Sequence, residues 1–200
     1  MVSDMNQVAK AWLAESIAVK QALLADTTLF AQIEDVARKC ADACLAGNKV
    51  LFAGNGGSAA DAQHLAGEFV SRFNYDRPGL AAFALTVDSS VMTAIGNDYG
   101  YDKIFERQVQ ACAKAGDVLI GLSTSGNSLN VIGGLEQARR MGVYAVAMTG
   151  ETGGKMRTLC DICIRVPSTK TPRIQECHIT IGHIICGLVE QTIFPRRASL

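Results

Sequence analysis

The stretch LFAGNGGSAADAQHLAGEF, residues 51–69, passes from an apolar run through a glycine-rich turn into a helical pattern. A short apolar run that ends at such a turn is typical of a strand buried on both faces of a parallel sheet. The turn itself has two interpretations. It is either only a tight strand-to-helix connection, or a site where free backbone N–H groups hold an anion.

An apolar run followed by a helical pattern recurs along the chain. We expect strands at 49–54, 81–86, 117–123, 144–149 and 161–166. We expect helices at about 57–73, 89–96, 102–114, 127–141 and 152–159, and a last helix at about 172–193. Parallel strands joined by helices form right-handed crossovers. The sequence therefore predicts an α/β fold, a three-layer αβα sandwich with a five-stranded parallel sheet.

Residues 1–47 contain two helical patterns and no strand pattern. Val8, Trp12 and Ile17 recur at helical spacing, and Asp26 is a capping candidate for the second helix. A small domain gains little from two long helices ahead of its sheet unless they pack against something. We therefore expect a single domain, 1–200, in which residues 1–47 are N-terminal oligomerisation helices.

The 200-residue chain is balanced in charge, with 19 Lys and Arg against 19 Asp and Glu. A nucleic-acid-binding surface normally produces a basic excess, so we expect no nucleic-acid partner. The N-terminal segment does not resemble a signal peptide, and no apolar run reaches the roughly 18 residues of a membrane span. We expect a cytoplasmic protein with no membrane partner.

The seven cysteines are odd in number and lie mostly among apolar neighbours. Cys160 and Cys163, together with His178 and His183, have a spacing that fits a zinc finger. The two cysteines run into the strand expected at 161–166, however, and residues three apart on a strand point to opposite faces. We therefore interpret the pair as core residues.

The turn at residues 123–128, STSGNS, supplies four hydroxyls and a glycine where a strand gives way to a helix. Free N–H groups and the positive end of the helix dipole converge at such a point, which suits a phosphate dianion. A cluster of N-cap residues is the alternative, but one cap needs one such residue and this turn has five polar ones. The turn lacks the lysine of a GxxxxGK[ST] loop, which argues against a nucleoside triphosphatase.

The first turn, GNGGS at residues 54–58, is a weaker candidate for a dinucleotide site. It is not GxGxxG, and no acidic residue closes the following strand, because Asp88 lies slightly beyond it. Its small residues nevertheless let a ligand approach the backbone closely.

His64 and Glu68 are four residues apart and share one face of the first crossover helix. The other two histidines, His178 and His183, lie on the last helix, and Gln175 lies two turns before His183. Each of these side chains alone is most simply structural or solvated. Beside a phosphate turn, the two helix faces together could bind zinc, or could supply an acid and a base.

Four segments of the chain match a known family: GNGGSAADAQHLAGEFVSRF, TAIGNDYGYDKIFERQV, GDVLIGLSTSGNS, and RIQECH with a later GH. They resemble the sugar isomerase (SIS) domain proteins and, more narrowly, the bacterial phosphoheptose isomerases. The resemblance covers essentially the whole chain. It implies a flavodoxin-like sheet, a cytoplasmic homotetramer with active sites at or near subunit interfaces, and one zinc ion (Zn²⁺) per subunit.

The resemblance also implies an activity and a set of site residues. The activity is the conversion of D-sedoheptulose 7-phosphate to D-glycero-D-manno-heptose 7-phosphate, the first step towards ADP- or GDP-heptose and the lipopolysaccharide core. The implied catalytic pair is Glu68 and His183, and the implied zinc ligands are His64, Glu68, Gln175 and His183. The implied substrate contacts are Asn55, Gly56, Gly57, Ser58, Glu68, Asn97, Asp98, Ser123, Thr124, Ser125, Ser128 and Gln175.

Three alternatives stay open. A non-enzymatic SIS protein that binds the replication initiator would not need an acid–base pair, whereas this chain has Glu68 and His183. A sugar-phosphate-sensing regulator would normally carry a DNA-binding domain, for which the residues before the sheet leave little room. An isomerase of a pentose or hexose phosphate would share the fold, and no residue pattern measures the length of the sugar.

Overall fold

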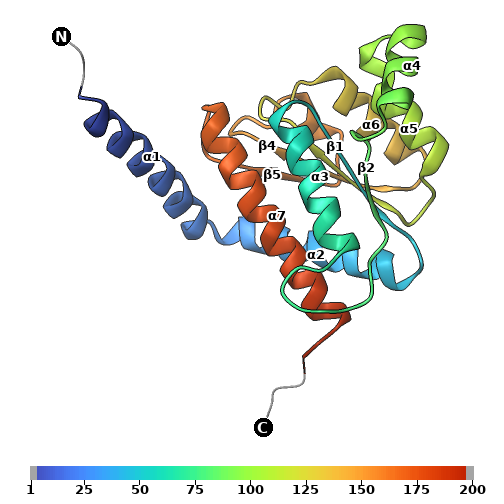
Figure 1. Ribbon diagram of the computed structural model, residues 1–200, viewed down its shortest axis with the longest axis horizontal. Coiled ribbons are helices and arrows are strands. Elements are labelled where there is room, and N and C mark those ends of the chain that lie inside the picture. The colour runs from blue at the N-terminus through green and yellow to red at the C-terminus, as the bar shows by residue number, and fades with distance from the viewer. Residues whose placement is uncertain (1–3, 197–200) are drawn as a thin grey trace.

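The computed structural model of the protein describes residues 4–196. Within this range, five strands form one parallel sheet in the order β2-β1-β3-β4-β5 (Figure 1). The strands are β1 (Val50–Gly54), β2 (Ala82–Ala84), β3 (Val118–Leu122), β4 (Tyr144–Thr149) and β5 (Ile162–Arg165). Each strand falls inside its expected range, so the predicted α/β fold with its parallel sheet is confirmed.

The described residues also form seven α-helices and two short 3₁₀-helices, and the helices cover both faces of the sheet (Figure 1). The α-helices are α1 (Met5–Ala25), α2 (Thr27–Leu45), α3 (Gly57–Val70), α4 (Ser89–Tyr99), α5 (Ile104–Cys112), α6 (Leu129–Arg140) and α7 (Thr171–Ile193). The 3₁₀-helices are η1 (Tyr101–Lys103) and η2 (Lys155–Thr158). This is the three-layer sandwich that the alternating pattern predicts.

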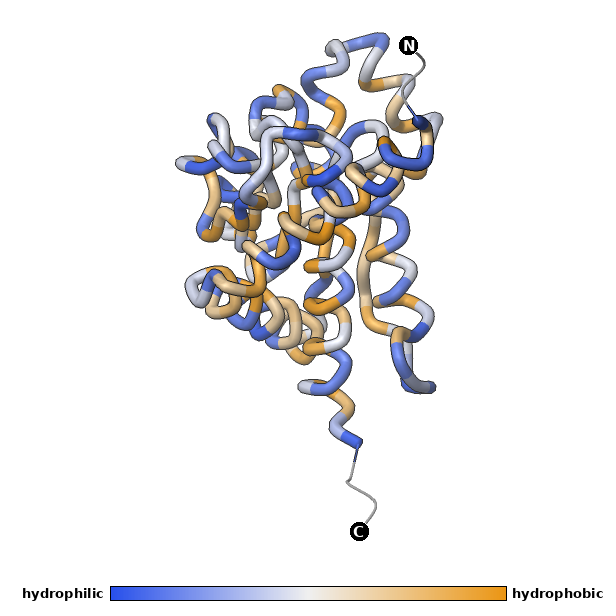
Figure 2. The backbone as a smooth tube through the Cα atoms, turned by 90° about the vertical axis from the view of Figure 1, so that its left-hand side faces the viewer, coloured by the Kyte–Doolittle hydropathy of each residue, from blue (hydrophilic) through white to orange (hydrophobic). Residues whose placement is uncertain are grey.

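The sheet divides the apolar interior into two cores, because successive side chains of a strand point to opposite faces. Phe52, Ile120 and Met148 pack with α2, α3 and α7 on one face. Leu51 and Leu119 pack with α5 and α6 on the other. Along the helices, hydrophobic and hydrophilic residues alternate with the helical turn, as the colours of Figure 2 show. Helices α2, α3, α5, α6 and α7 therefore each turn one side to a core and the other to solvent.

One expected helix is shorter than the sequence suggests. The pattern predicts a helix at 152–159, but the chain forms only the single 3₁₀ turn of η2 there. Gly153 and Gly154 have φ angles of 77° and 51°, in the left-handed region, which a right-handed helix does not contain. These glycines stop any helix before Lys155.

The two N-terminal helices differ in their packing. Asp26 caps α2 as predicted, since its carboxylate accepts hydrogen bonds from the N–H groups of Thr28 and Leu29 at 2.9 and 3.2 Å. α2 buries a full face, including Ile33, and is a layer of this chain's own core. α1 extends away from the body of the domain (Figure 1) and buries only Ser16 and Leu23 among the residues described. An oligomerisation role is therefore open to α1, whereas α2 is needed by the fold itself.

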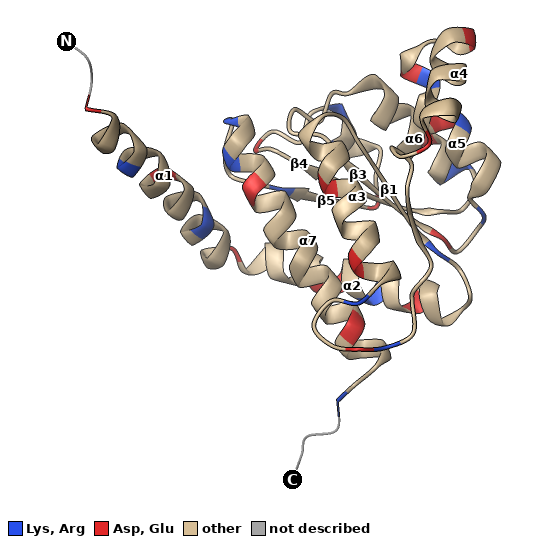
Figure 3. Cartoon of the chain, viewed as in Figure 1, with Lys and Arg blue, Asp and Glu red and all other residues tan. Residues whose placement is uncertain are grey.

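The surface carries interspersed charges. Figure 3 shows basic and acidic residues mixed along the helices and loops, without a large region of one sign in that view. Within residues 4–196, no helix has the length and apolar character needed to span a membrane.

Candidate active site

The order of the sheet creates a crevice between β1 and β3. The chain runs from β1 outward to β2 and then returns to the other side of β1 to form β3. Crevices at such a reversal, outside the carboxyl ends of the strands, are the usual ligand sites of open α/β sheets. A cavity of about 300 Å³ lies here, lined by Asn55, Gly56, Gly57, Ser58, Leu122, Ser123, Thr124, Ser128, Thr171 and Gln175.

Three helices begin at this cavity. Gly57, Ser128 and Thr171 line it, and they lie at the starts of α3, α6 and α7. In all three helices, which lie within the described residues, no side chain caps the N-terminus. The positive ends of three helix dipoles therefore face one cavity, an arrangement that favours a phosphate group.

The second turn is held in shape by its own hydroxyls and by a neighbouring segment. The Oγ atoms of Ser123 and Ser128 lie 2.9 Å apart, which closes the turn. Gly126 has a φ of 66°, and a Cβ there would lie 2.2 Å from the carbonyl oxygen of Gly153. Only glycine fits this contact. The turn therefore depends on the position of the segment that contains Gly153.

A buried amide fixes the first turn. Asn55 and Asn130 exchange two side-chain hydrogen bonds of 2.8 and 2.9 Å, and Asn130 is buried at the start of α6. The hydroxyl of Tyr101 donates to the same oxygen of Asn55 at 3.1 Å. Asn130 and Tyr101 were not among the site residues predicted from the sequence. An asparagine two residues after the second serine–glycine turn was the available signal, but it is also common for simple capping.

Two imidazoles and a carboxylate meet beside α3 and α7. The Nε2 atom of His64 lies 2.8 Å from Nε2 of His183 and 3.2 Å from Oε1 of Glu68. One donor atom from each of the three residues lies within 4.8 Å of the others. Glu68 and His183 are partly buried, whereas His64 is exposed. This cluster can hold a metal ion, or can pass a proton along its hydrogen bonds.

A buried ion pair anchors the end of α3 that carries Glu68. The Arg77 guanidinium donates to Oε1 of Glu190 at 3.1 Å and to the backbone oxygen of Glu68 at 2.7 Å. Both charged side chains are almost completely buried. The N–H groups of Phe73 and Asn74 also donate to Glu190, at 2.9 and 2.7 Å. This pair was not predicted, although the charge of Glu190 within an apolar stretch of the last helix was a signal for it in the sequence.

Known proteins share this architecture. A model of the SIS domain family matches residues 11–150. A phosphoheptose isomerase of Aneurinibacillus thermoaerophilus is 61% identical over 193 residues, which are 96% of this chain and 98% of the relative. Phosphoheptose isomerase 2 of Campylobacter jejuni is 54% identical over 99% of this chain and 98% of its own length. This chain belongs to the phosphoheptose isomerase family of SIS domain proteins.

Solved structures of phosphoheptose isomerases agree with the assignment. One from Neisseria gonorrhoeae has a TM-score of 0.86 at 42% identity and covers 92% of this chain and 99% of that structure. One from Francisella tularensis has a TM-score of 0.88 at 34% identity, covering 95% of this chain and 100% of that structure. The family predicted from the sequence motifs is therefore confirmed.

The substrate contacts implied by the resemblance to phosphoheptose isomerases lie in three different parts of the structure. Ser125 is exposed and does not line the cavity, and Asn97 and Asp98 hydrogen-bond to each other on the exposed surface of α4. Glu68 belongs to the imidazole–carboxylate cluster. The others line the cavity: Asn55, Gly56, Gly57, Ser58, Ser123, Thr124, Ser128 and Gln175.

Gln175 lies at the cavity. A Cβ on Gly57 would lie 2.5 Å from its amide Nε2, so this amide packs directly on the glycine-rich turn. His64, Glu68 and His183 are the three implied zinc ligands that the structure brings together. Gln175 and His183 are eight residues apart on α7, which corresponds to about 12 Å of helix.

His178 and the two neighbouring cysteines do not form the zinc-finger set that their spacing allows. His178 is fully buried, with Nε2 3.2 Å from the backbone oxygen of Thr149, and burial lowers its pKa to about 4. It is therefore a neutral structural residue. Cys160 and Cys163 pack partly buried against the second core, but the reason given for separating them is wrong. β5 begins only at Ile162, so Cys160 lies in the preceding bend and the argument from strand geometry does not apply to it.

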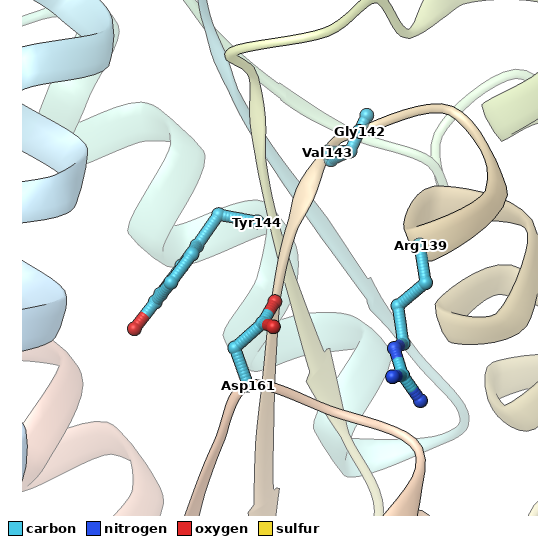
Figure 4. A pocket seen from close by; sticks show the side chains of 5 residues that line it. All are labelled: Arg139, Gly142, Val143, Tyr144 and Asp161. Carbon is cyan, nitrogen blue, oxygen red and sulfur yellow. The ribbon is translucent and has the colours of Figure 1, made fainter.

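A separate hollow of about 250 Å³ lies at the opposite end of the strands, where β4 begins (Figure 4). It is lined by Arg139, Gly142, Val143, Tyr144 and Asp161. The Asp161 carboxylate accepts a hydrogen bond from the N–H of Ala145 at 2.7 Å, and the Tyr144 hydroxyl donates to Asp35 at 3.1 Å. These polar groups support the strand ends, so the hollow is not a second candidate for the active site.

Proposed function

We propose that the protein isomerises D-sedoheptulose 7-phosphate to D-glycero-D-manno-heptose 7-phosphate, the first step towards activated heptose. The observation that carries the proposal is the pairing of a cavity suited to phosphate with a cluster of Glu68, His64 and His183 on the same helices. An aldose–ketose isomerase needs both, because the phosphate anchors the sugar while an acid and a base act at its other end. The membership in the phosphoheptose isomerase family supports the seven-carbon substrate.

The spacing of the two parts favours an extended sugar. Gln175 marks the phosphate end on α7 and His183 marks the other, about 12 Å further along the helix axis. An open-chain sugar phosphate lying along α7 would place its phosphate at the helix N-termini. Its first two carbons would then lie beside Glu68 and His183.

The reaction moves one proton between two carbons. In this proposal, the Glu68 carboxylate takes the proton from C1 and returns it to C2, through an enediol. His183 moves a proton between the oxygens of C2 and C1, so the ketone becomes a hydroxyl as the aldehyde forms. The hydrogen-bonded contacts of His64 with both residues keep their rings and carboxylate oriented towards one point. Asn55 would hold a hydroxyl between the two ends.

The donor atoms of the cluster also fit a zinc ion. Two imidazole nitrogens and a carboxylate oxygen that converge on one point are a common catalytic zinc set, with a further position free for substrate. In our proposal His64, Glu68 and His183 hold the zinc. Gln175 becomes a fourth protein ligand if its side chain turns away from the cavity. A bound zinc ion would supply a Lewis acid beside the sugar oxygens.

Metal analysis tests the zinc proposal. Purified protein should contain one zinc ion per chain, and His64→Ala should lose most of it, because a donor nitrogen is removed. The exposed variant Gln63→Ala is the matched control and should retain the metal. Full activity in protein stripped of metal, with no zinc taken up on reconstitution, would contradict the proposal.

A substrate comparison tests the activity. The protein should convert sedoheptulose 7-phosphate to the aldose faster than it converts fructose 6-phosphate or ribulose 5-phosphate, with product identified by chromatography. A higher kcat/KM for a five- or six-carbon ketose phosphate would assign the enzyme to a different sugar. No conversion of any of them would favour a non-enzymatic SIS protein.

Removing hydroxyls from the cavity should weaken substrate binding. Thr124→Ala with Ser128→Ala should cost about 1–3 kcal/mol in total, since hydrogen bonds to a charged phosphate are lost. Calorimetric titration with the sugar phosphate measures this loss. Thr192→Ala, which removes an exposed hydroxyl at the far end of α7, is the control. Unchanged affinity in the double variant would place the phosphate elsewhere.

We also propose that the single domain assembles as a homotetramer in the cytoplasm, where its phosphorylated substrate is made. The exposed apolar side chains of α1 support this assembly: Met5, Trp12, Leu13, Ile17 and Leu24. α1 also contacts the start of α7 beside the cavity, where Glu15 pairs with Lys170 and Arg173. A partner that covers α1 would therefore lie close to the active site. The exposed Asn97 and Asp98 could contribute to the site of a neighbouring subunit.

Light scattering tests the role of α1. The intact protein should have four times the chain mass of 21.2 kDa. Leu13→Glu with Ile17→Glu should give smaller species, because two charges enter the apolar side of α1. Gln7→Glu adds a charge to an exposed polar position and should leave the assembly intact. A monodisperse, active wild-type monomer would contradict the proposal.

A further inference from the structure

Cys160 and Cys163 form a pair of thiols outside the active site. Cys160 lies in the bend between η2 and β5, and Cys163 lies in β5 at the edge of the sheet. They lie three residues apart across this bend and pack against the same core, where each thiol shifts the pKa of the other. Both are only partly buried, so a small solute reaches them, whereas Cys40, Cys177 and Cys186 are buried.

The surroundings of the pair favour a thiolate. The neighbouring Cys160 thiol is the largest influence on Cys163, and it outweighs burial and lowers the Cys163 pKa to about 6. Thr149, Arg165 and Arg157 add to this effect. The interaction between the two thiols also raises the pKa of Cys160. Burial raises the pKa of each of the other five cysteines: Cys40, Cys44, Cys112, Cys177 and Cys186. Thiolates are the reactive form of cysteine, so Cys163 differs in kind from those five.

The pair also touches both segments that support the phosphate turn. On one side, Thr149 Oγ1 lies 3.6 Å from the Cys163 sulfur, and the next residue, Gly150, donates its N–H to the Thr124 oxygen at 3.0 Å. On the other side, η2 leads directly into the bend at Cys160. Its Met156 N–H donates to the Gly126 oxygen at 3.0 Å.

We propose that Cys160 and Cys163 are a reversible oxidation site, at which a peroxide or a small disulfide produces an intramolecular disulfide that loosens the phosphate turn. A disulfide brings two sulfurs to about 2.05 Å, closer than a hydrogen bond does, so the bend at 159–161 must move towards β5. η2 moves with it, and its contact with Gly126 is disturbed. The effect on the turn rests on the proposed phosphate site, whereas disulfide formation does not.

The chemistry balances with hydrogen peroxide as the oxidant. The Cys163 thiolate attacks one oxygen, the O–O bond breaks, and a sulfenic acid and hydroxide form. The Cys160 sulfur then attacks the Cys163 sulfur, so an S–S bond forms and the S–O bond breaks. The Cys160 proton and the leaving hydroxide become one water, and the hydroxide of the first step becomes the second by taking up the proton that Cys163 released as it became a thiolate. In total, two thiols lose two electrons and two protons, and one peroxide becomes two waters.

Peptide mapping tests the disulfide. Trypsin cuts after Arg157 and Arg165, so both cysteines lie in one peptide, TLCDICIR. The intact protein is treated with hydrogen peroxide, and its free thiols are then blocked with iodoacetamide. This peptide should be unalkylated, with a mass lower by two hydrogens than that of the same peptide with two free thiols. Dithiothreitol should restore two alkylatable thiols. In Cys160→Ser, Cys163 should instead be found as a sulfenic acid or a mixed disulfide.

Cys112→Ser is the matched control. Cys112 is the exposed cysteine outside the pair, and its removal should leave the disulfide unchanged. The proposal is overturned if both thiols of the peptide stay alkylatable at a peroxide concentration that oxidises Cys112 in the wild type. It is also overturned if a bond from Cys163 to any other cysteine predominates.

A binding measurement tests the coupling to the turn. Reduced wild-type protein should bind sedoheptulose 7-phosphate about fivefold or more tightly than the oxidised protein. The Cys160→Ser variant should show no such loss under the same peroxide treatment. Equal affinity of the two wild-type forms would refute the coupling. A reduced protein that binds no sugar phosphate would instead refute the proposed function, with the peptide result unaffected.

Discussion

Turnover by Glu68→Gln should fall by about 10²- to 10⁴-fold, the usual contribution of a general base, while the fold survives. Glutamine has nearly the same shape as glutamate and can still accept a hydrogen bond from His64, but it cannot take a proton from carbon. The substitution therefore separates the basicity of the carboxylate from its packing. The exposed carboxylate of Glu136 on α6 is the control, and Glu136→Gln should keep wild-type turnover.

Exchange of hydrogen with solvent gives the decisive measurement. In deuterated water, the wild type should introduce deuterium at C1 or C2 of the sugar, and Glu68→Gln should do so at a rate reduced in proportion to turnover. Exchange at the wild-type rate in the variant would remove Glu68 from the role of base. Glu68 would then act at most as a metal ligand.

The two histidines of α7 should behave differently from each other. His183 meets His64 and Glu68, so its replacement should affect the reaction. The sequence alone indicated that His178 would matter less, because it lies about 140° around the helix from His183. The structure adds the reason, since His178 is buried with its ring against the Thr149 oxygen. Its replacement should therefore appear as lost stability.

The fold could be predicted from the sequence because its strands are buried on both faces. Val50–Gly54 and Val118–Leu122 are completely buried, so their segments read as continuous apolar runs between polar turns. The pairing of His64 with Glu68 was accessible for a similar reason, because four residues are one turn of helix. Local periodicity determines both features.

Contacts between distant segments could not be predicted from local patterns in this way. His64 and His183 are far apart in the sequence, and only the packing of α3 against α7 brings their rings together. The position of Cys160 in a bend depends on where β5 begins, and an apolar pattern does not locate a strand end to a single residue. The packing of α2 in this chain's own core was not predicted, because helical spacing shows that a face is apolar, not which surface covers it.

Breaking the ion pair between Arg77 and Glu190 should destabilise the protein by about 3–5 kcal/mol, the usual cost of leaving one buried partner uncompensated. Glu190→Gln is the sharpest variant. It keeps the volume of the side chain but leaves the Arg77 charge unpaired. It also replaces one carboxylate oxygen with an amide NH2 group, which cannot accept the hydrogen bond that the N–H of Phe73 or Asn74 donates. Urea unfolding at neutral pH measures the loss. Asp76→Asn, at the exposed position next to Arg77, should change stability by less than about 0.5 kcal/mol.

The pH dependence of the same variant identifies the cause. Burial opposes the charge of Glu190, but the N–H donors of Phe73 and Asn74 and the Arg77 guanidinium outweigh it, so the folded pKa lies below the ordinary value. A carboxylate with a lowered folded pKa contributes stability above its unfolded pKa of about 4.3 and loses it as the pH falls through the folded pKa. The difference in unfolding free energy between wild type and Glu190→Gln should therefore be constant from pH 7 to about pH 5 and shrink below that. A difference that stays the same at low pH would mean that packing, and not the charge of Glu190, holds the end of α3 in place.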